Sequence, residues 1–198
     1  MANHTYKNFA TLRERIAFQN AVLDATEKMP TILKDARANT KTVATRAFKM
    51  YFGAFDLKRF EKVLGILNAM CMAFDSSGIV FERRYGGNPN TCAATAPPGG
   101  VWVEQTPQQI AESAHKNEFT YKMFVGEAFY TATNSIDRTI KSAQFNTICH
   151  EMSHMVGNTN DPVYGNVQSR ILAGNDPTTA CDCAENFGFY CEMIYLGL

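Results

Sequence analysis

Residues 149–165 read CHEMSHMVGNTNDPVYG, and this stretch determines how the rest of the chain is interpreted. His150 and His154 stand four residues apart, so on a helix both imidazoles lie on one face, close enough to bind a single metal ion. Zinc is the ion that the pattern H-E-x-x-H predicts. The alternative is a helix that buries two neutral histidines beside an exposed glutamate.

Glu151 directly follows the first predicted ligand and is expected to face the open coordination position of the metal. A carboxylate there can take a proton from the attacking water and pass it to the leaving amine. The pattern therefore predicts hydrolysis of peptide bonds without a covalent intermediate.

A catalytic zinc with two histidine ligands needs a third ligand from the protein. Asn160 stands where the spacing of metzincins would put it, but an amide is a poor zinc ligand. Glu185 or Glu192 could serve on a later helix, as in gluzincins. Asp161 offers a carboxylate oxygen seven residues past His154, after a turn that Gly157 permits.

The stretch 159–165 has the form T-x-D-x-x-Y-G, and with it the chain resembles the aspzincin zinc metallopeptidases, the family of deuterolysin and peptidyl-Lys metalloendopeptidase. The resemblance covers roughly residues 12–192. It implies zinc bound by His150, His154 and Asp161, with Glu151 as general base and acid. Further landmarks follow in the family's order: Tyr51-Phe52-Gly53, Ala128-Phe129-Tyr130, Asn175-Asp176-Pro177 and Ala184-Glu185-Asn186-Phe187.

The same resemblance implies roles for Tyr164 and Glu185. Tyr164 would donate its hydroxyl to the developing oxyanion, and its alternative is a ring that packs on the helix. Glu185 would attract a basic side chain on the leaving side of the scissile bond. Gly188 stands where lysine-selective members carry a second acid. The alternative for Glu185 is a carboxylate at the surface or behind the metal ligands.

Hydrophobic spacing predicts an α+β protein that is mostly helical with a small sheet, and the resemblance implies one zincin-like domain over residues 1–198. Its parts are a helical front (1–76), strands and loops (77–130), and the zinc-site helix, T-x-D-x-x-Y-G loop and C-terminal helix (131–198). Pro30 and Gly53 divide the front into about three helices, and Asp56 caps the third.

Three strands are expected, in residues 78–85, 100–104 and 119–125, and residues 119–124 could form the edge strand along which an extended peptide is bound. The zinc-site helix is expected to begin after Asn134-Ser135 and to stop at Gly157. A last helix or pair covers 167–195. Six cysteines allow disulfides, and the expected pairings are Cys149 with Cys181 or Cys183, and Cys71 with Cys92.

The overall composition excludes several classes of protein. Nineteen basic residues balance nineteen acidic ones among 198, which excludes a polybasic nucleic-acid binder. No apolar run approaches the roughly 20 residues that span a bilayer, so no membrane partner is expected. The first residues lack the apolar core of a secretory signal, and the expectation is a secreted mature fragment or an exported effector.

Together these patterns predict a monomeric zinc-dependent endopeptidase that acts on protein or peptide substrates, with a preference for Lys or Arg on the leaving side as a further hypothesis. The alternative is an exported toxin or effector module whose zinc site is mainly structural and which acts by binding a partner. The presence of Glu151 argues against that alternative, since a structural site gains nothing from a base.

Overall fold

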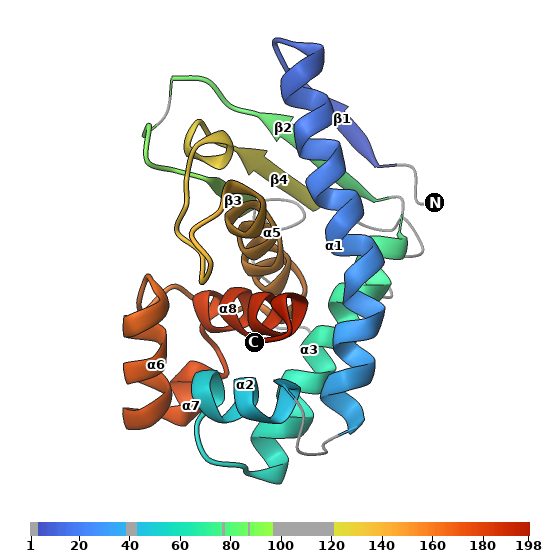
Figure 1. Ribbon diagram of the computed structural model, residues 1–198. Helices are drawn as coiled ribbons and strands as arrows, with labels where there is room; N and C mark the ends of the chain where they lie inside the picture. Colours follow the sequence, from blue (N-terminus) through green and yellow to red (C-terminus); the bar gives the residue numbers. More distant parts are fainter. Residues whose placement is uncertain (1–3, 39–42, 77, 87, 97–120) are drawn as a thin grey trace.

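The structure, a computed structural model, describes residues 4–38, 43–76, 78–86, 88–96 and 121–198. Helices predominate in these residues, and a small sheet lies at one end of the molecule (Figure 1), which confirms the predicted α+β class. The helices are α1 (Leu12–Ala38), α2 (Val43–Phe52), α3 (Leu57–Asp75), the 3-10 helix η2 (Ala128–Tyr130), α5 (Ile140–Gly157), α6 (Asn166–Asn175), α7 (Pro177–Ala180) and α8 (Ala184–Leu196).

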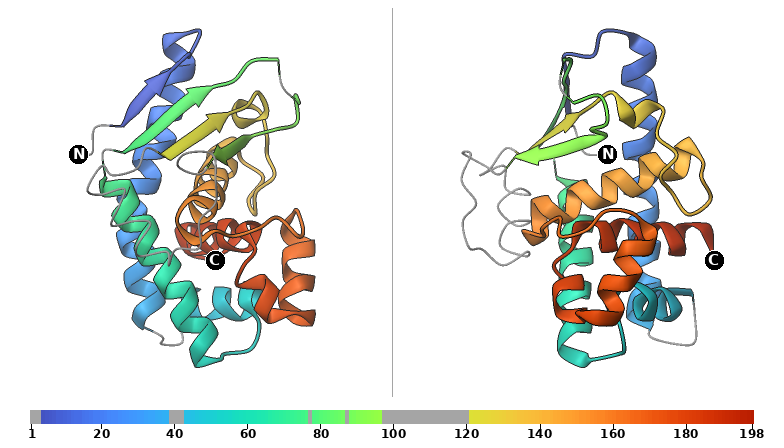
Figure 2. Two further views of the ribbon diagram at one scale, coloured as in Figure 1. Left: turned by 180° about the vertical axis from the view of Figure 1, so that it is seen from behind. Right: turned by 90° about the vertical axis from the view of Figure 1, so that its left-hand side faces the viewer.

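The sheet has the order β1 (Thr5–Lys7), β2 (Ile79–Arg83), β4 (Tyr121–Val125) and β3 (Ala93–Ala96). The first three strands are parallel, and β3 pairs antiparallel with β4. The prediction that residues 119–124 form the edge strand is therefore wrong, because β4 lies between β2 and β3 (Figure 2). The edge strand beside β4 is β3, which lies in a segment predicted from the sequence to be a loop. The strand expected at 100–104 lies outside the described residues.

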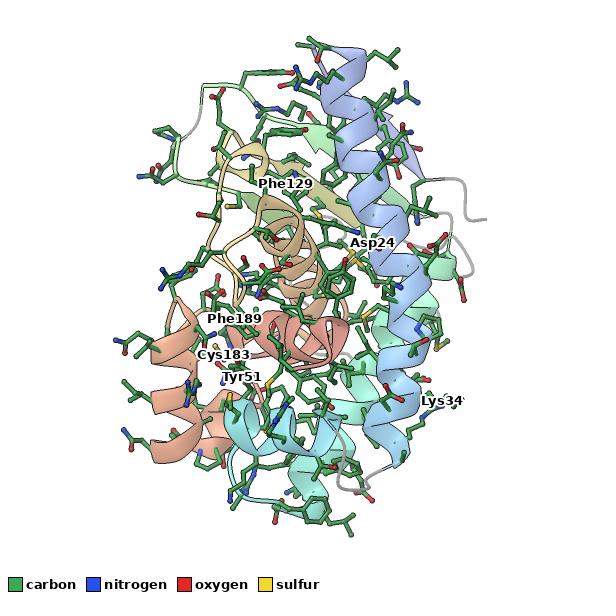
Figure 3. All side chains as sticks on the ribbon, viewed as in Figure 1. Asp24, Lys34, Tyr51, Phe129, Cys183 and Phe189 are labelled. Atoms are coloured by element: carbon green, nitrogen blue, oxygen red, sulfur yellow. The ribbon has the colours of Figure 1, made fainter. Side chains whose placement is uncertain are left out.

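Aromatic side chains join the helices to the sheet and to one another. Phe18 of α1 contacts Phe81 of β2 and Phe129 of η2, with ring centroids 5.1 and 5.0 Å apart. Tyr51 of α2 stacks on Phe189 of α8 at 6.0 Å, and Figure 3 shows the two helices side by side at this contact. One hydrophobic core thus extends from α1 to α8, and α5 passes through it.

Two expectations about the helical front need correction. Tyr6 belongs to strand β1 instead of a helix. Pro30 does not end a helix, because α1 continues through it to Ala38. Buried Met29, Ile32 and Leu33 hold this part of α1 against the core, so packing outweighs the hydrogen bond that proline removes. The predicted cap of α3 is confirmed, since the amide of Arg59 donates to Asp56 Oδ1 at 2.9 Å.

Helix α5 starts later than expected. Its cap is Thr139, whose hydroxyl accepts from the Ser142 amide at 3.2 Å, instead of Asn134-Ser135. At the other end the left-handed residue is Asn158, with a φ of 50°. Gly157 instead permits close packing, because a Cβ there would come within 3.1 Å of the Ile66 side chain.

The expected disulfides are absent from this structure, in which all six cysteines are free thiols. Cys149 is fully buried; its thiol donates to Met29 Sδ at 4.0 Å and also interacts with the thiol of Cys191 on α8. The pairings not formed are Cys149 with Cys181 or Cys183, and Cys71 with Cys92. In the part of the chain that the structure describes, no helix combines the length and apolarity needed to cross a membrane.

Candidate metal centre

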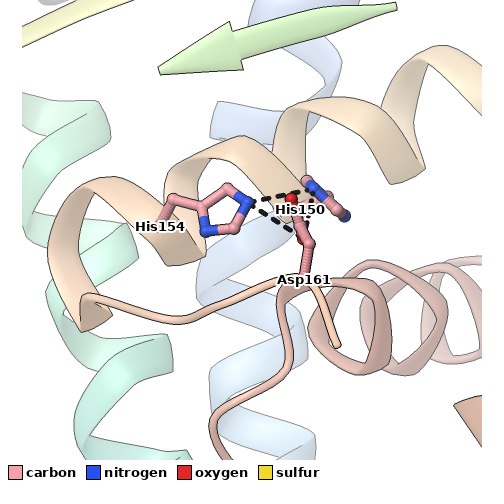
Figure 4. A group of neighbouring side chains, drawn as sticks. All are labelled: His150, His154 and Asp161. Atoms are coloured by element: carbon pink, nitrogen blue, oxygen red, sulfur yellow. Dashed lines mark hydrogen bonds and ion pairs between the residues drawn. The ribbon is translucent and has the colours of Figure 1, made fainter. Parts of the chain in front are cut away.

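Three side chains converge at the C-terminal half of α5 and the loop that follows it (Figure 4). The Nε2 atoms of His150 and His154 are 3.1 Å apart, and Asp161 Oδ1 lies 3.3 Å from the first and 3.2 Å from the second. Zinc ligands at about 2.0–2.1 Å in tetrahedral geometry are roughly 3.3 Å from each other. The donor atoms therefore have the separation that one zinc ion requires.

The opposite ring nitrogens show which way the lone pairs point. His154 Nδ1 lies 2.6 Å from the carbonyl oxygen of Thr159, which can only accept, so Nδ1 carries a proton. His150 Nδ1 donates in the same way to Glu185 Oε2 at 2.9 Å. In the neutral rings both Nε2 lone pairs then face the Asp161 carboxylate. Three lone pairs that face one another need positive charge between them, either a metal ion or a proton on an Nε2 atom, and a far ring nitrogen held in this way is typical of histidine ligands.

The electrostatics of the group also favour positive charge between these side chains. Burial lowers the pKa of His150, but hydrogen bonds to Asp161 and Glu185 outweigh burial and raise it to about 10. Burial raises the pKa of the Asp161 carboxyl, whereas its hydrogen bonds to both histidines hold that pKa well below its usual range. Asp161 is therefore an anion at neutral pH, as a zinc ligand must be.

Glu151 lies beside the three candidate ligand atoms, and one of its carboxylate oxygens is free to accept a hydrogen bond. Its side chain is 5% exposed, and Oε1 is 3.9 Å from His150 Nε2. Oε2 is buried and has no hydrogen-bond partner among the described residues. Burial raises the pKa of Glu151, opposed by the two histidines and by a hydrogen bond from the side chain of Thr95 in β3. A buried carboxylate oxygen without a partner can accept a proton from a water molecule held next to it.

Backbone hydrogen bonds of Asn160 fix the loop just before Asp161. Before Asp161, the amide of Asn160 donates to Asp182 O at 2.7 Å, and the amide of Ala184 donates to Asn160 O at 2.9 Å. This short bridge ties the loop to the start of α8. Asn160, the metzincin position, thus contributes its backbone to the loop, and it is Asp161 whose side chain reaches the histidines.

Tyr164 lies at the rim of the group. Its hydroxyl donates to Asp161 Oδ2 at 3.0 Å, and the side chain is exposed. Burial of the hydroxyl end and the neighbouring Asp161 carboxylate raise the pKa of Tyr164 to about 12. The phenol therefore keeps its proton at neutral pH and is able to donate it to a hydrogen bond.

The carboxylates of Glu185 and Glu192 do not join the three candidate ligand atoms. Both oxygens of Glu185 are engaged behind the metal group, one by His150 Nδ1 and one by the amide of Gly165 at 2.6 Å. Glu192 accepts from Asn146 Nδ2 at 2.9 Å and from the amide of Ile136 at 2.6 Å. The contacts of Glu185 fit its alternative role, a carboxylate behind the ligands, and do not fit a binding site for a basic side chain.

A cleft of about 310 Å³ opens onto these residues. Its walls come from the segment before β3, the loop after η2, α5, and the loop with Asp161. The lining residues are Asn90, Thr91, Cys92, Ala93, Ala132, Asn134, Ala143, Asn146, Thr147, His150, Glu151, Asp161, Tyr164 and Glu185.

The sequence from residue 37 to residue 192 matches the aspzincin family model, which is described as lysine-specific metallo-endopeptidase. The match covers well over half of the chain. This chain belongs to the aspzincin family. The family predicted from T-x-D-x-x-Y-G is thereby confirmed.

Two relatives of this aspzincin extend the comparison. An extracellular protease of Aeromonas hydrophila is 35% identical over 147 residues, which are 73% of this chain and 35% of that protein. The chain therefore spans about a third of the length of that relative. A zinc peptidase from Grifola frondosa has the same fold, with a TM-score of 0.69 and 22% identity over 92% of this chain and 96% of the other.

Sequence reasoning missed several supporting residues of this aspzincin. Thr159 is buried, and its carbonyl orients His154 while its hydroxyl lies 2.9 Å from that of Ser153. Thr95 and Gly165 contact Glu151 and Glu185. Thr159 and Gly165 stand inside the T-x-D-x-x-Y-G pattern, so the pattern contained a signal for them. Thr95 had none.

Proposed function

We propose that this aspzincin is a zinc-dependent endopeptidase. The observation that carries the proposal is the convergence of His150 Nε2, His154 Nε2 and Asp161 Oδ1 within 3.1–3.3 Å, beside a buried carboxylate oxygen of Glu151 with no hydrogen-bond partner. Zinc held by the three ligands would polarise the peptide carbonyl and make a nearby water more acidic.

The chain's own residues supply the remaining steps. Glu151 holds the attacking water, accepts its proton on the free oxygen and passes that proton to the leaving amine. The Tyr164 hydroxyl, beside the Asp161 carboxylate, is placed to donate to the negative charge that develops on the carbonyl oxygen. Strand β3 is an edge strand of the described sheet and its Ala93 lines the same cleft, and we infer that an extended peptide pairs with it.

Proteins or peptides are the substrates that this arrangement fits, and secretion is the setting that the extracellular relative supports. A preference for Lys or Arg on the leaving side would follow from the family description. That preference depends on a free carboxylate in the cleft, which is considered below. The alternative of a partner-binding module with a structural zinc gains no support from the site, because a structural ion needs no unpaired base such as Glu151.

The test is hydrolysis of a denatured protein mixture by the purified chain. Activity should disappear with a zinc chelator and return when zinc is added. Glu151→Gln should bind zinc as the wild type does and lose activity by about 100- to 10,000-fold, the typical contribution of a general base. The exposed Glu61→Gln serves as a matched control and should keep full activity. Activity that resists the chelator, or a fully active Glu151→Gln, would contradict the proposal.

A further inference from the structure

Glu185 uses its whole carboxylate to join two parts of the metal centre. The residue sits in the first turn of α8 and is 5% exposed. Oε2 accepts from His150 Nδ1 at 2.9 Å, and Oε1 accepts from the amide of Gly165 at 2.6 Å. A carboxylate that accepts from the far nitrogen of a histidine ligand fixes the tautomer and orientation of that ring.

The second contact extends this effect to the loop. Gly165 has a φ of 88°, which glycine adopts readily, and it directly follows Tyr164 and precedes α6. Its amide has no partner inside α6, so the Glu185 oxygen satisfies an otherwise unpaired donor at the start of that helix. One buried side chain of α8 thereby sets the position of His150 on α5 and of the loop that carries Asp161.

The described walls of the cleft offer few free carboxylates to a basic side chain of a substrate. Glu151, Asp161 and Glu185 are the carboxylates among the described lining residues, and each already has a role in the candidate metal centre. Gly188 stands one turn after Glu185 on α8 and carries no second acid. A Cβ at Gly188 would lie 2.7 Å from Asn146 Oδ1, so the buried Asn146 of α5 would have to move to admit a side chain there.

We propose that Glu185 is a positioning residue that orients His150 and the Gly165 loop, and that its carboxylate does not bind a lysine side chain on the leaving side of the scissile bond. The first part concerns the metal ligands alone. The second part rests on the proposed endopeptidase function.

The first experiment measures zinc affinity of the metal-stripped protein by competition with a chromophoric chelator. Glu185→Gln should weaken zinc binding by about 10- to 100-fold, the usual cost of losing the partner behind a histidine ligand. Glu192→Gln is the matched control, a buried glutamate of the same helix that contacts no metal ligand, and its zinc affinity should stay within about three-fold of wild type. Unchanged affinity in a folded Glu185→Gln would overturn the positioning role.

The second experiment compares kcat/KM for two peptides that differ in having lysine or alanine on the leaving side. A positioning role predicts that Glu185→Gln lowers both values by the same factor at saturating zinc. A selective loss of lysine cleavage would make Glu185 a substrate-binding acid and contradict the proposal.

The third experiment maps the sites that the wild type and Glu185→Gln cleave in a denatured proteome, at saturating zinc. Both should cleave before the same residues, and a loss of lysine sites alone in the variant would overturn this part of the proposal. If the wild type cleaves nothing, the endopeptidase function itself fails, while the zinc measurement still decides the role of Glu185.

Discussion

Tyr164 allows a test at the level of a single hydroxyl group. The group donates to Asp161 Oδ2, whereas the histidines face Oδ1, so its loss should leave the three donors in place. We expect Tyr164→Phe to lower kcat by about 10- to 100-fold with little change in KM, because the hydroxyl acts on charge that develops in the transition state. Zinc affinity should change by less than about three-fold.

Steady-state kinetics and chelator competition measure the two effects of Tyr164→Phe separately. Tyr85→Phe is a suitable control, since Tyr85 also donates to a carboxylate, Glu14 Oε2 at 3.1 Å, and is not among the described residues that line the cleft. An unchanged kcat in Tyr164→Phe would show that its ring merely packs at the rim of the cleft.

Single residues were predictable where local spacing fixed their geometry. His150 and His154 follow from the helical repeat, whereas Asp161 was one of several candidate third ligands until the T-x-D-x-x-Y-G resemblance singled it out. The structure brings all three together. The contacts of Glu185 and Thr95 depend on how α8 and β3 pack against α5, which no local pattern encodes. For the same reason the sequence could not decide between the two roles weighed for Glu185.

At the level of elements, Glu192 links α8 to α5 and to the loop after η2. Its pKa is raised to about 7, mainly by burial, against an ordinary value of 4.5, with hydrogen bonds from Asn146 and Ile136 opposing the shift. The folded state therefore binds more protons than the unfolded state between these values. The contribution of Glu192 to the free energy of unfolding is constant below pH 4.5, falls as the pH rises toward 7, and is constant again above it.

Glu192→Gln removes this titration and should stabilise the protein more at pH 8 than at pH 4.5. The change in its effect across that range should approach about 3 kcal/mol at most, since each pKa unit corresponds to about 1.4 kcal/mol. Denaturant unfolding of zinc-free wild type and variant at a series of pH values measures it, with Glu61→Gln as control. Stability curves that run parallel at all pH values would show that Glu192 does not titrate in this range.

Elements with a strong local signal were predictable, and those formed by tertiary pairing were not. The cap at Asp56 and the strand at β2 match the expectation. Strands β1 and β3 have three and four residues, so pairing with their neighbours decides their conformation more than composition does. Strand β3 is an edge because it pairs with β4 alone in the described sheet, and no local pattern in the sequence encodes this strand order.

At the level of the whole molecule, zinc should stabilise the fold because the ligands come from two separate segments, α5 and the loop before α6. A free zinc concentration about 1,000 times Kd adds about 4 kcal/mol to the free energy of unfolding. For a chain of this size that corresponds to an increase of about 8–16 °C in Tm. Differential scanning calorimetry with and without chelator measures the shift. His154→Ala should show none, and an equal shift in that variant would place the zinc elsewhere.

The bridge between Asn160 and the start of α8 has a consequence for how quickly the protein takes up metal. Because the fold itself immobilises the aspartate loop, the entropy of ordering it is lost during folding and not during ion capture. The amides of Asn160 and Ala184 should therefore exchange slowly with deuterium even in chelator-treated protein. Exchange as fast as in an exposed peptide would contradict this expectation. Slow exchange would mean that the binding site is already formed when the ion arrives, so that diffusion and dehydration of the ion limit the rate of its capture.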